Sequence, residues 1–263
     1  MNGGGGWQPC CPLPQSGEVY PDDPRRTTHR QELWRLDGRE PVTLQVEAGE
    51  IVGLIGPNGA GKTTFLNSVA GTYRPSSGKV HFMGDETTGA VAEVMCRKGL
   101  SRTFQIPRPF PKLTALENVM VGARFGALRD DPKPARQRAE EALEFVQFPM
   151  DIHAPADRLN AVQLKRLDLG RALACGPKLM FLDELASGLT PAELDAMMAL
   201  ILKIRDTCGV GMIVVEHIMK VITGICERVL VIQYGTPIAE GTAEEVMGDP
   251  KVIEAYLGEE VVA

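Results

Sequence analysis

Residues Gly56 to Thr64 bring together the glycines, the lysine and the threonines that phosphate binding requires. The run reads Gly56-Pro57-Asn58-Gly59-Ala60-Gly61-Lys62-Thr63-Thr64. With the spacing G-x-x-x-x-G-K-T, successive backbone N–H groups can curl around phosphate oxygens. Lys62 would then reach the terminal phosphates, and the Thr63 hydroxyl would be available to Mg²⁺. The spacing therefore predicts a nucleotide-binding loop that takes a phosphate chain together with Mg²⁺.

Two adjacent carboxylates, Asp183 and Glu184, follow the apolar run Leu179–Leu182. A buried parallel strand would deliver both to the carboxyl edge of the sheet, where ligands of α/β proteins bind. There Asp183 could hold Mg²⁺, usually through water, and Glu184 could polarise an attacking water as a general base. A strand that ends in Asp-Glu is common by itself and is usually only a solvated strand end. The assignment therefore depends on the motifs that accompany it.

The chain from Val42 onward alternates strand patterns with helix patterns. The predicted strands are Val42–Val46, Ile51–Ile55, Gly78–Phe82, Thr103–Phe104, Leu179–Leu182, Met212–Val215 and Arg228–Ile232. The strand Ile51–Ile55 leads directly into the phosphate loop, and a helix is expected to begin near Lys62. Strands that alternate with helices indicate an α/β fold with a mainly parallel sheet, covered on both faces.

Residues from about 106 to 170 have the pattern of an inserted helical subdomain. The first predicted helix is Leu116–Phe125, and Thr114-Ala-Leu-Glu117 before it forms a capping box. The second is the charged, amphipathic Pro134–Phe148. The remaining predicted helices are Leu164–Cys175, one that begins at Thr190-Pro191 and one that begins at Thr242.

Bulk properties exclude several classes of protein. A chain of 263 residues with 44% hydrophobic residues suits one large α/β domain, with or without an inserted lobe. A net charge of −6 argues against a nucleic-acid-binding surface spread over the domain, so we expect no nucleic-acid partner. The longest apolar run, Ala196–Ile204, is too short to span a bilayer. Nothing at the start resembles a signal peptide, and six scattered cysteines indicate cytosolic thiols.

Two more polar residues complete the set. They lie in the motifs Arg102-Thr-Phe-Gln105 and Val214-Val-Glu-His217. With the phosphate loop and Asp183-Glu184, they follow the order and approximate spacing of the ATP-binding subunits of ABC transporters, which residues 42–258 resemble. The resemblance implies a P-loop NTPase with a mainly parallel core sheet, an antiparallel β subdomain and an inserted helical subdomain. It also implies that Gln105 senses Mg²⁺ and the attacking water, and that His217 contacts the γ-phosphate and orients Glu184.

Three longer runs resemble the ATPases of branched-chain amino-acid importers in particular. They are Arg102-Thr-Phe-Gln-Ile-Pro-Arg-Pro-Phe-Pro111, Leu116-Glu-Asn-Val-Met-Val-Gly122 and Pro250-Lys-Val-Ile-Glu-Ala-Tyr-Leu-Gly258. Such importers carry two different ATPase subunits, and the pair Phe104-Gln105 resembles the larger one. In that family, residues equivalent to Ile106–Pro111 face the transmembrane subunits. Importers of urea or other amides share much of this pattern, so they stay an alternative.

The resemblance also implies an activity, a location and partners. We expect hydrolysis of ATP with Mg²⁺, by a head-to-tail dimer with a second homologous ATPase subunit that sandwiches ATP. The dimer would drive uptake through two transmembrane permease subunits, served indirectly by a periplasmic or extracellular substrate-binding protein. The expected location is the cytoplasmic face of the plasma (inner) membrane, as a peripheral subunit.

The loop that binds the partner subunit's ATP departs from the family. The family commonly has Leu-Ser-Gly-Gly-Gln, and this chain has Leu159-Asn160-Ala161-Val162-Gln163. Asn160 still offers a side-chain donor and Val162 keeps its backbone N–H. A β-branched residue replaces glycine at Val162, which restricts the backbone. We therefore hypothesise that the composite site built on this loop is weakened, while the site built on the chain's own P-loop is competent.

The first 41 residues are the second departure, because the family has two strands and an adenine-stacking aromatic residue there. As written, the segment predicts disorder, and Trp34 is the residue best placed to stack on adenine. Codons for Gln31–Glu40, read from the second base, can encode Lys/Arg-Ser-Phe-Gly-Gly-Leu-Thr-Ala-Val-Asn, which resembles the missing family segment. The domain prediction is therefore an atypical segment, disordered or out of frame, over residues 1–41 and an ATPase domain over residues 42–263.

Other classes of P-loop protein fit less well. A non-transport ABC-type ATPase would carry long coiled-coil insertions or tandem ATPase domains, which this length does not accommodate. A GTPase or small-molecule kinase would leave Gln105 and His217 unexplained, and no Asn-Lys-x-Asp guanine motif is present. A subunit that only binds nucleotide would not need Glu184.

Overall fold

The computed structural model describes residues 42–260 of the 263-residue chain. Its centre is a six-stranded sheet in the spatial order β4-β5-β6-β1-β7-β8. In that order the strands are Leu100–Arg102, Leu179–Asp183, Gly211–Val215, Ile51–Ile55, Arg228–Gln233 and Thr236–Gly241. The first five are parallel and β8 is antiparallel to β7. The order of the strands brings β1, which precedes the phosphate loop, next to β6 and within two strands of β5.

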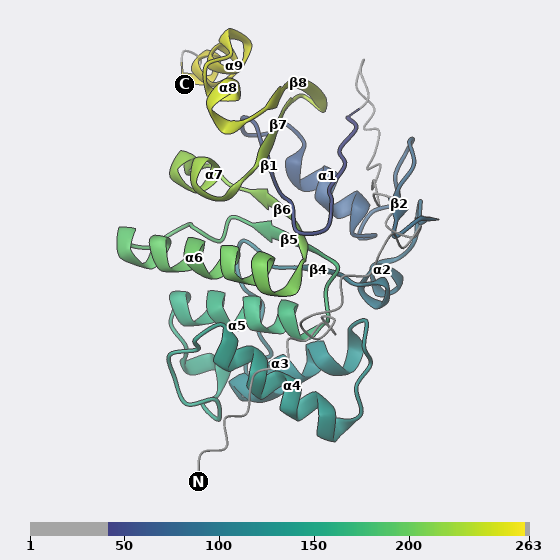
Figure 1. The fold of residues 1–263 in the computed structure, drawn as a ribbon, viewed down its shortest axis with the longest axis vertical. Helices are drawn as coiled ribbons and strands as arrows, with labels where there is room; N and C mark the ends of the chain where they lie inside the picture. Colours follow the sequence, from purple (N-terminus) through teal and green to yellow (C-terminus); the bar gives the residue numbers. More distant parts are fainter. Residues whose placement is uncertain (1–41, 261–263) are drawn as a thin grey trace, which may run out of the picture.

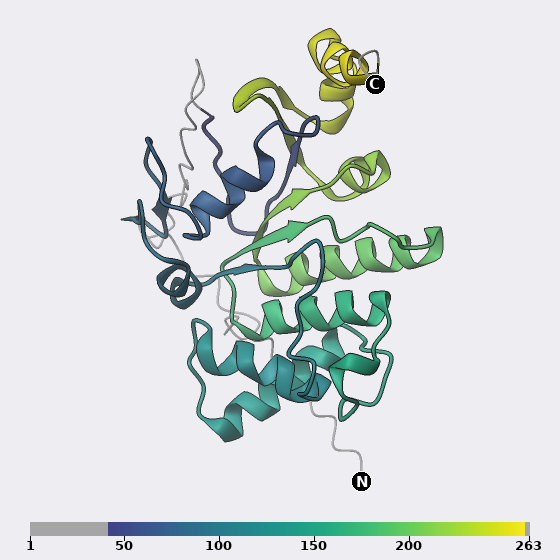
Figure 2. The same cartoon turned by 180° about the vertical axis from the view of Figure 1, so that it is seen from behind.

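Helices cover both faces of this sheet (Figures 1 and 2). Helix α1 (Lys62–Val69) packs on one face, and α6 (Pro191–Cys208) and α7 (Met219–Ile225) pack on the other. A sheet buried on both faces needs apolar residues at every position of its strands, which explains their continuous apolar runs. Strands β1, β5 and β6 are buried at all five of their positions.

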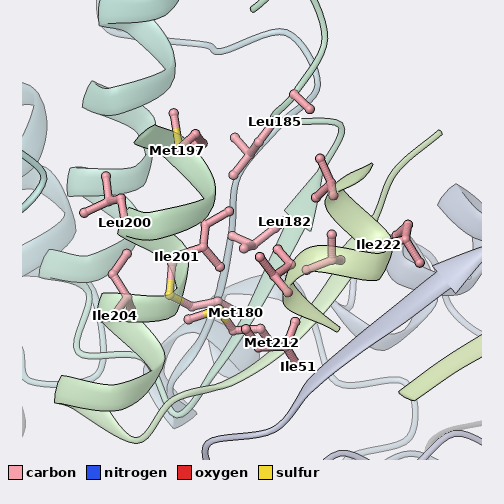
Figure 3. Packing of buried hydrophobic residues seen from close by; sticks show 14 of the residues in the cluster. Ile51, Met180, Leu182, Leu185, Met197, Leu200, Ile201, Ile204, Met212 and Ile222 are labelled. Carbon is pink, nitrogen blue, oxygen red and sulfur yellow. The ribbon is translucent and has the colours of Figure 1, made fainter. Parts of the chain in front are cut away.

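Successive residues of β5 point to opposite faces of the sheet and belong to two different hydrophobic clusters. Met180 and Leu182 belong to the cluster under α6 and α7, and Leu179 and Phe181 belong to the cluster under α1. Figure 3 shows the first cluster, in which Met180 and Leu182 lie beside the α6 residue Ile201. Burying one such side chain contributes about 1.5–3 kcal/mol. This packing holds the carboxyl end of β5 in place.

Three helices form a lobe beside the β4 end of the sheet, at the lower end of Figure 1. They are α3 (Ala115–Phe125), α4 (Pro132–Phe145) and α5 (Ala161–Ala174). Small residues let them approach closely: Ala135, Ala139 and Ala142 of α4 are fully buried, and a Cβ at Gly122 of α3 would lie 2.4 Å from the Arg171 carbonyl of α5. A 3₁₀ turn, Ala156–Arg158, precedes α5.

The remaining elements lie around the edges of the sheet. The hairpin of β2 (His81–Phe82) and β3 (Asp85–Glu86) is antiparallel, and α2 (Ala92–Lys98) follows it. Helices α8 (Ala243–Met247) and α9 (Pro250–Glu260) close the chain beyond β8. Among residues 42–260, the structure has no helix whose length and apolar content would let it cross a membrane.

Most predicted elements are confirmed, with shifted ends. The capping box at Thr114 and Glu117 forms and starts α3, and the helix predicted as Pro134–Phe148 is α4, which begins at Pro132 and ends at Phe145. The elements that the sequence patterns did not predict are α2, α7, α9, β3 and β8, which are short or lack a clear apolar period.

Three strand predictions need correction. Residues 42–46 have the predicted alternation, because Val42, Leu44 and Val46 are buried, but only Leu44 of this segment forms a β-bridge and no strand is formed. Alternation predicts which side is buried and does not by itself predict the extent of a strand. The strand predicted over residues 78–82 is reduced to His81–Phe82. The strand predicted around Thr103–Phe104 is β4, which ends at Arg102, because the Phe104 N–H turns away to donate to the Asp168 carboxylate at 3.0 Å.

Candidate nucleotide-binding and catalytic site

The phosphate loop connects β1 to α1. Two of its positions require glycine, one because a side chain would clash and one because of its backbone conformation. At Gly56 φ is +151°, and a Cβ would lie 2.0 Å from the carbonyl oxygen of Ile232 in β7. At Gly61, the N-cap of α1, φ is +102°, in the left-handed region that favours glycine. The Gly235 N–H donates to the Ala60 carbonyl at 2.8 Å. Strand β7 and the turn after it therefore hold the loop in shape.

Lys62 lies inside this loop and is 7% exposed. Its Nζ donates to the carbonyl oxygens of Gly56 and Pro57 at 2.6 and 2.9 Å. The exposed residues of the loop and of the first helical turn are Asn58, Gly59, Thr63 and Thr64. A buried cation, exposed hydroxyls and the N–H groups at the start of a helix suit an anionic phosphate chain. The chemistry of these donors fits a nucleoside triphosphate.

Asp183 ends β5 and is 6% exposed. Its Oδ2 accepts a hydrogen bond from Nη2 of Arg102, on the neighbouring strand β4, at 2.6 Å. The same guanidinium donates through Nη1 to Oδ1 of Asn67, on α1. One side chain thus links α1, β4 and β5, and it ties the Asp183 carboxylate to the helix that carries Thr63.

Glu184 follows Asp183 in an uncommon backbone conformation, with φ at +48°. Its N–H donates to the Val215 carbonyl of β6 at 2.9 Å, which helps to offset a strain on the order of 1 kcal/mol. Nε2 of His217 lies 3.1 Å from Glu184 Oε1, and Nε2 of Gln105 donates to Glu184 Oε2. The three residues predicted as catalytic are therefore brought together, with Glu184 in the middle.

The loop after Glu184 rests on two buried charged residues. Nζ of Lys165, on α5, donates to the carbonyl oxygens of Leu185 and Ser187 at 2.7 and 2.6 Å, and burial lowers the pKa of this lysine. Oε1 of Glu216, at the end of β6, accepts from the Ala186 N–H at 2.7 Å, and burial raises the pKa of Glu216. These contacts fix the backbone around the Glu184 carboxylate.

The loop of residues 160–163 forms the start of α5. The Gln163 N–H donates to Asn160 Oδ1, and the Asn160 N–H donates to Gln163 Oε1, both at 2.9 Å. This capping box satisfies helix N–H groups locally. Ala161 and Val162 occupy the first helical turn, so the β-branched side chain of Val162 sits in a conformation open to any residue. The expected backbone restriction at Val162 therefore has no visible cost here.

Sequence reasoning missed Arg102, Lys165 and Glu216 as parts of the site. Arg102 and Glu216 belong to the motifs of Gln105 and His217, so their proximity in sequence was an available signal. Lys165 had none, because its partners are backbone carbonyls about 20 residues away. The predicted adenine-stacking Trp34 and the possible frame change lie outside the described residues.

Two family models match the chain. The model described as ABC transporter matches residues 40–187. The model described as branched-chain amino acid ATP-binding cassette transporter matches residues 236–262, which include α8 and α9.

Curated relatives agree with these matches. The high-affinity branched-chain amino acid transport ATP-binding protein BraF of Pseudomonas aeruginosa is 38% identical over 231 residues, covering 83% of this chain and 91% of its own length. The corresponding protein LivG of Escherichia coli is 36% identical with the same coverage.

Solved structures share the fold. An ATP-binding cassette of an ABC transporter in its ADP conformation has a TM-score of 0.75 at 27% identity, covering 87% of this chain and 98% of that one. A dimeric, post-hydrolysis cassette bound to ADP and phosphate has a TM-score of 0.69 at 26% identity, covering 81% and 97%. The chain therefore belongs to the ABC transporter family, as one of its ATP-binding ATPase subunits.

Proposed function

We propose that this subunit hydrolyses ATP to power the uptake of branched-chain or related amino acids through transmembrane partners. The observation that carries the proposal is the arrangement around Glu184, whose two carboxylate oxygens contact His217 and Gln105. The names of the curated relatives support the substrate class. The match of residues 236–262 to the branched-chain amino acid model supports it as well.

Each residue of the site has a role in this proposal. Lys62 and the amides of residues 56–64 bind the phosphates, and Glu184 takes a proton from the attacking water as general base. His217 contacts the γ-phosphate and orients Glu184, while Gln105 senses the water and the metal. Positioning and electrostatics supply most of the rate acceleration in phosphoryl transfer.

Mg²⁺ is part of the proposal, with Thr63, Asp183 and Gln105 as the residues that hold it. The donor set fits this ion, which is usually bound by one or two carboxylates together with substrate phosphates. The described residues include no group of three His, Cys, Asp or Glu side chains that could hold a metal. When bound, Mg²⁺ neutralises the charge that develops on the phosphates.

Two features suggest the partners: the loop Asn160–Gln163, whose proposed ligand lies on another subunit, and an exposed apolar surface. We infer a head-to-tail dimer with a second homologous ATPase subunit, in which Asn160–Gln163 of each chain meets the ATP on the other. A dimeric cassette among the similar structures supports this arrangement. The proposed location is the cytoplasmic face of the inner membrane, bound to two permease subunits and served by a substrate-binding protein.

An apolar groove between the sheet edge and the helical lobe is the proposed contact with the permease. Its volume is about 410 Å³, and its walls come from α2, β4, α3 and α5. Phe104, Phe110 and Phe125 line it and are 37%, 48% and 68% exposed. The 75% exposed Ile106 lies in the same segment, so residues 106–111 offer the apolar surface that a partner would cover.

The test is reconstitution of the chain with the second ATPase and the permeases that its genomic neighbours encode, in vesicles that also receive the binding protein. We expect ATP-dependent accumulation of labelled leucine, isoleucine or valine, and none when Glu184→Gln replaces the wild type. Accumulation of urea or short amides in place of these amino acids would select the related importer class. ATP hydrolysis that needs no membrane partner and moves no solute would overturn the transport function.

A further inference from the structure

Arg102 joins three parts of the site, although no motif role is assigned to it. Its ion pair with Asp183 is 2.6 Å long, and the two side chains are 11% and 9% exposed. Its other terminal nitrogen donates to Asn67 on α1. Its guanidinium carbon lies 5.4 Å from the centre of the Phe104 ring. The guanidinium is thus held by α1 and by an aromatic face while it presents one N–H to Asp183.

The geometry of the guanidinium makes this link directional. Its N–H groups form a planar, rigid fork, so anchoring one terminal nitrogen on Asn67 sets the position of the other. That other nitrogen binds Oδ2 of Asp183, and Oδ1 of Asp183 has no hydrogen bond to the described residues. The carboxylate therefore has one oxygen held and one oxygen available, in a fixed orientation.

We propose that Arg102 is a positioning residue for Asp183: it holds Oδ2 so that Oδ1 stays oriented toward the Mg²⁺ that accompanies the nucleotide phosphates. This inference rests on the proposed function, because it takes Asp183 as the metal carboxylate. Groups that orient a metal ligand typically matter by about 10- to 100-fold in metal affinity when they are removed.

The positive charge of Arg102 acts in the opposite direction to its hydrogen bond. A guanidinium beside a metal carboxylate repels the cation, so removing it would strengthen metal binding if charge were the main effect. The two side chains are only 11% and 9% exposed, so salt screens this repulsion little. Loss of the charge and loss of the hydrogen bond therefore change metal binding in opposite directions. We expect the loss of orientation to dominate, so that Arg102→Gln weakens metal binding.

The experiment compares wild type with Arg102→Gln, Arg102→Lys and Asn67→Ala, each as the full chain paired with its second ATPase subunit. The measurement is the Kd of ATP with excess Mg²⁺ and with EDTA in its place. The ratio of the two values reports the coupling between metal and nucleotide. Mn²⁺ binding to the nucleotide complex, followed by electron paramagnetic resonance, gives a second readout that needs no hydrolysis.

We expect Arg102→Gln to reduce this coupling by about tenfold while the Kd in EDTA stays unchanged. Arg102→Lys keeps the charge but cannot bridge both partners, so it should lose part of the coupling. Asn67→Ala removes only the anchor and should give the smallest loss in the same direction. Arg97→Gln is the matched control, because its ion pair with Glu93 lies on the surface of α2.

The outcomes separate this inference from the function on which it rests. Wild-type coupling, or stronger coupling, in a folded Arg102→Gln protein would overturn the positioning role. If Arg102→Gln does not fold, Arg102→Lys and Asn67→Ala decide the question: reduced coupling between metal and nucleotide supports the positioning role, and unchanged or stronger coupling overturns it. A wild-type protein that binds no ATP at all would refute the proposed function instead, whatever the variants do.

Discussion

The edge of the sheet that carries Glu184 and the loop of residues 160–163 are built in different ways. At the sheet edge, Gln105, Glu184 and His217 follow three different strands and meet through side-chain contacts. In the loop, Asn160 and Gln163 bond only three residues apart, in a capping box that the start of any helix could form. In the first region, the side chains that contact Glu184 all come from this chain. In the second region, the hydrogen bonds of the loop are made within the loop, and its proposed ligand lies on another subunit.

This contrast explains why the two regions tolerate departures from the family differently. A change at the sheet edge removes a partner from a network in which each side chain positions another. A change in the loop leaves the helix intact, since the capping box needs only an acceptor at Asn160 and an amide at Gln163. The departure of this loop from the family motif is therefore compatible with a stable protein, and its effect should appear in the assembled dimer.

The largest expected effect comes from Glu184→Gln. Removing the proposed general base should lower ATP turnover at this chain's P-loop site by at least about 100-fold while ATP binding is retained, because the amide keeps the shape and loses the basicity. Single-turnover hydrolysis at the site that uses this chain's P-loop measures the first, with the equivalent base of the second subunit replaced, and nucleotide titration measures the second. Glu93→Gln, on the surface of α2, is the control and should leave both unchanged. Turnover within threefold of wild type would exclude Glu184 as the base.

The next effect concerns Lys165, which connects the two regions because it lies on α5 and holds the loop after Glu184. Lys165→Met leaves the buried carbonyl oxygen of residue 185 and the part-buried one of residue 187 without their donor. We expect the free energy of unfolding to fall by about 2–4 kcal/mol. Chemical denaturation provides the measurement, with the exposed Lys133→Met as control. A loss below about 0.5 kcal/mol would show that water replaces the ammonium without cost.

A smaller effect should distinguish the two composite sites of the proposed heterodimer. We expect single-turnover hydrolysis at the site that uses residues 160–163 to be roughly five- to tenfold slower than at the site that uses this chain's P-loop. Val162→Gly should reduce the difference between the two rates. Rapid-quench experiments isolate each site in turn. Glu184→Gln silences the site that uses this chain's P-loop, and the equivalent substitution on the second subunit silences the other site. Equal rates would contradict a weakened loop.

The smallest expected effect is a change in the pH dependence of stability. Burial raises the pKa of Glu216 above its ordinary value of 4.5, so the folded state holds this proton more tightly than the unfolded state. Its contribution therefore favours folding at low pH, and stability declines as pH rises from about 4.5 through the raised pKa. Glu216→Gln should make this decline shallower. Denaturation at several pH values measures the slope, and an unchanged slope would show that Glu216 titrates as in the unfolded chain.

Local patterns predicted most of the helices and strands, but they predicted fewer of the residues at which these begin and end. The Thr114 capping box and the apolar run Leu179–Leu182 identified α3 and β5, because caps and buried strands have short-range signatures. The end of β4 could not be predicted, since the Phe104 N–H is taken by Asp168 from α5. Residues 42–46 showed the converse case, because their alternation predicted which side chains are buried while only Leu44 of the segment forms a β-bridge.

Residue types and short spacings predicted the groups of the candidate site: the phosphate loop around Lys62, the paired carboxylates and the polar residues at positions 105 and 217. These depend on residue type and on spacing within one turn or strand. Which groups meet is seen in the folded chain alone, where Glu184 lies between His217 and Gln105 and Arg102 joins Asp183 to α1. Those contacts span 33 to 81 residues of chain, and the order of strands in the sheet sets them. No local pattern encodes that order, because it results from burying both faces of the sheet at once.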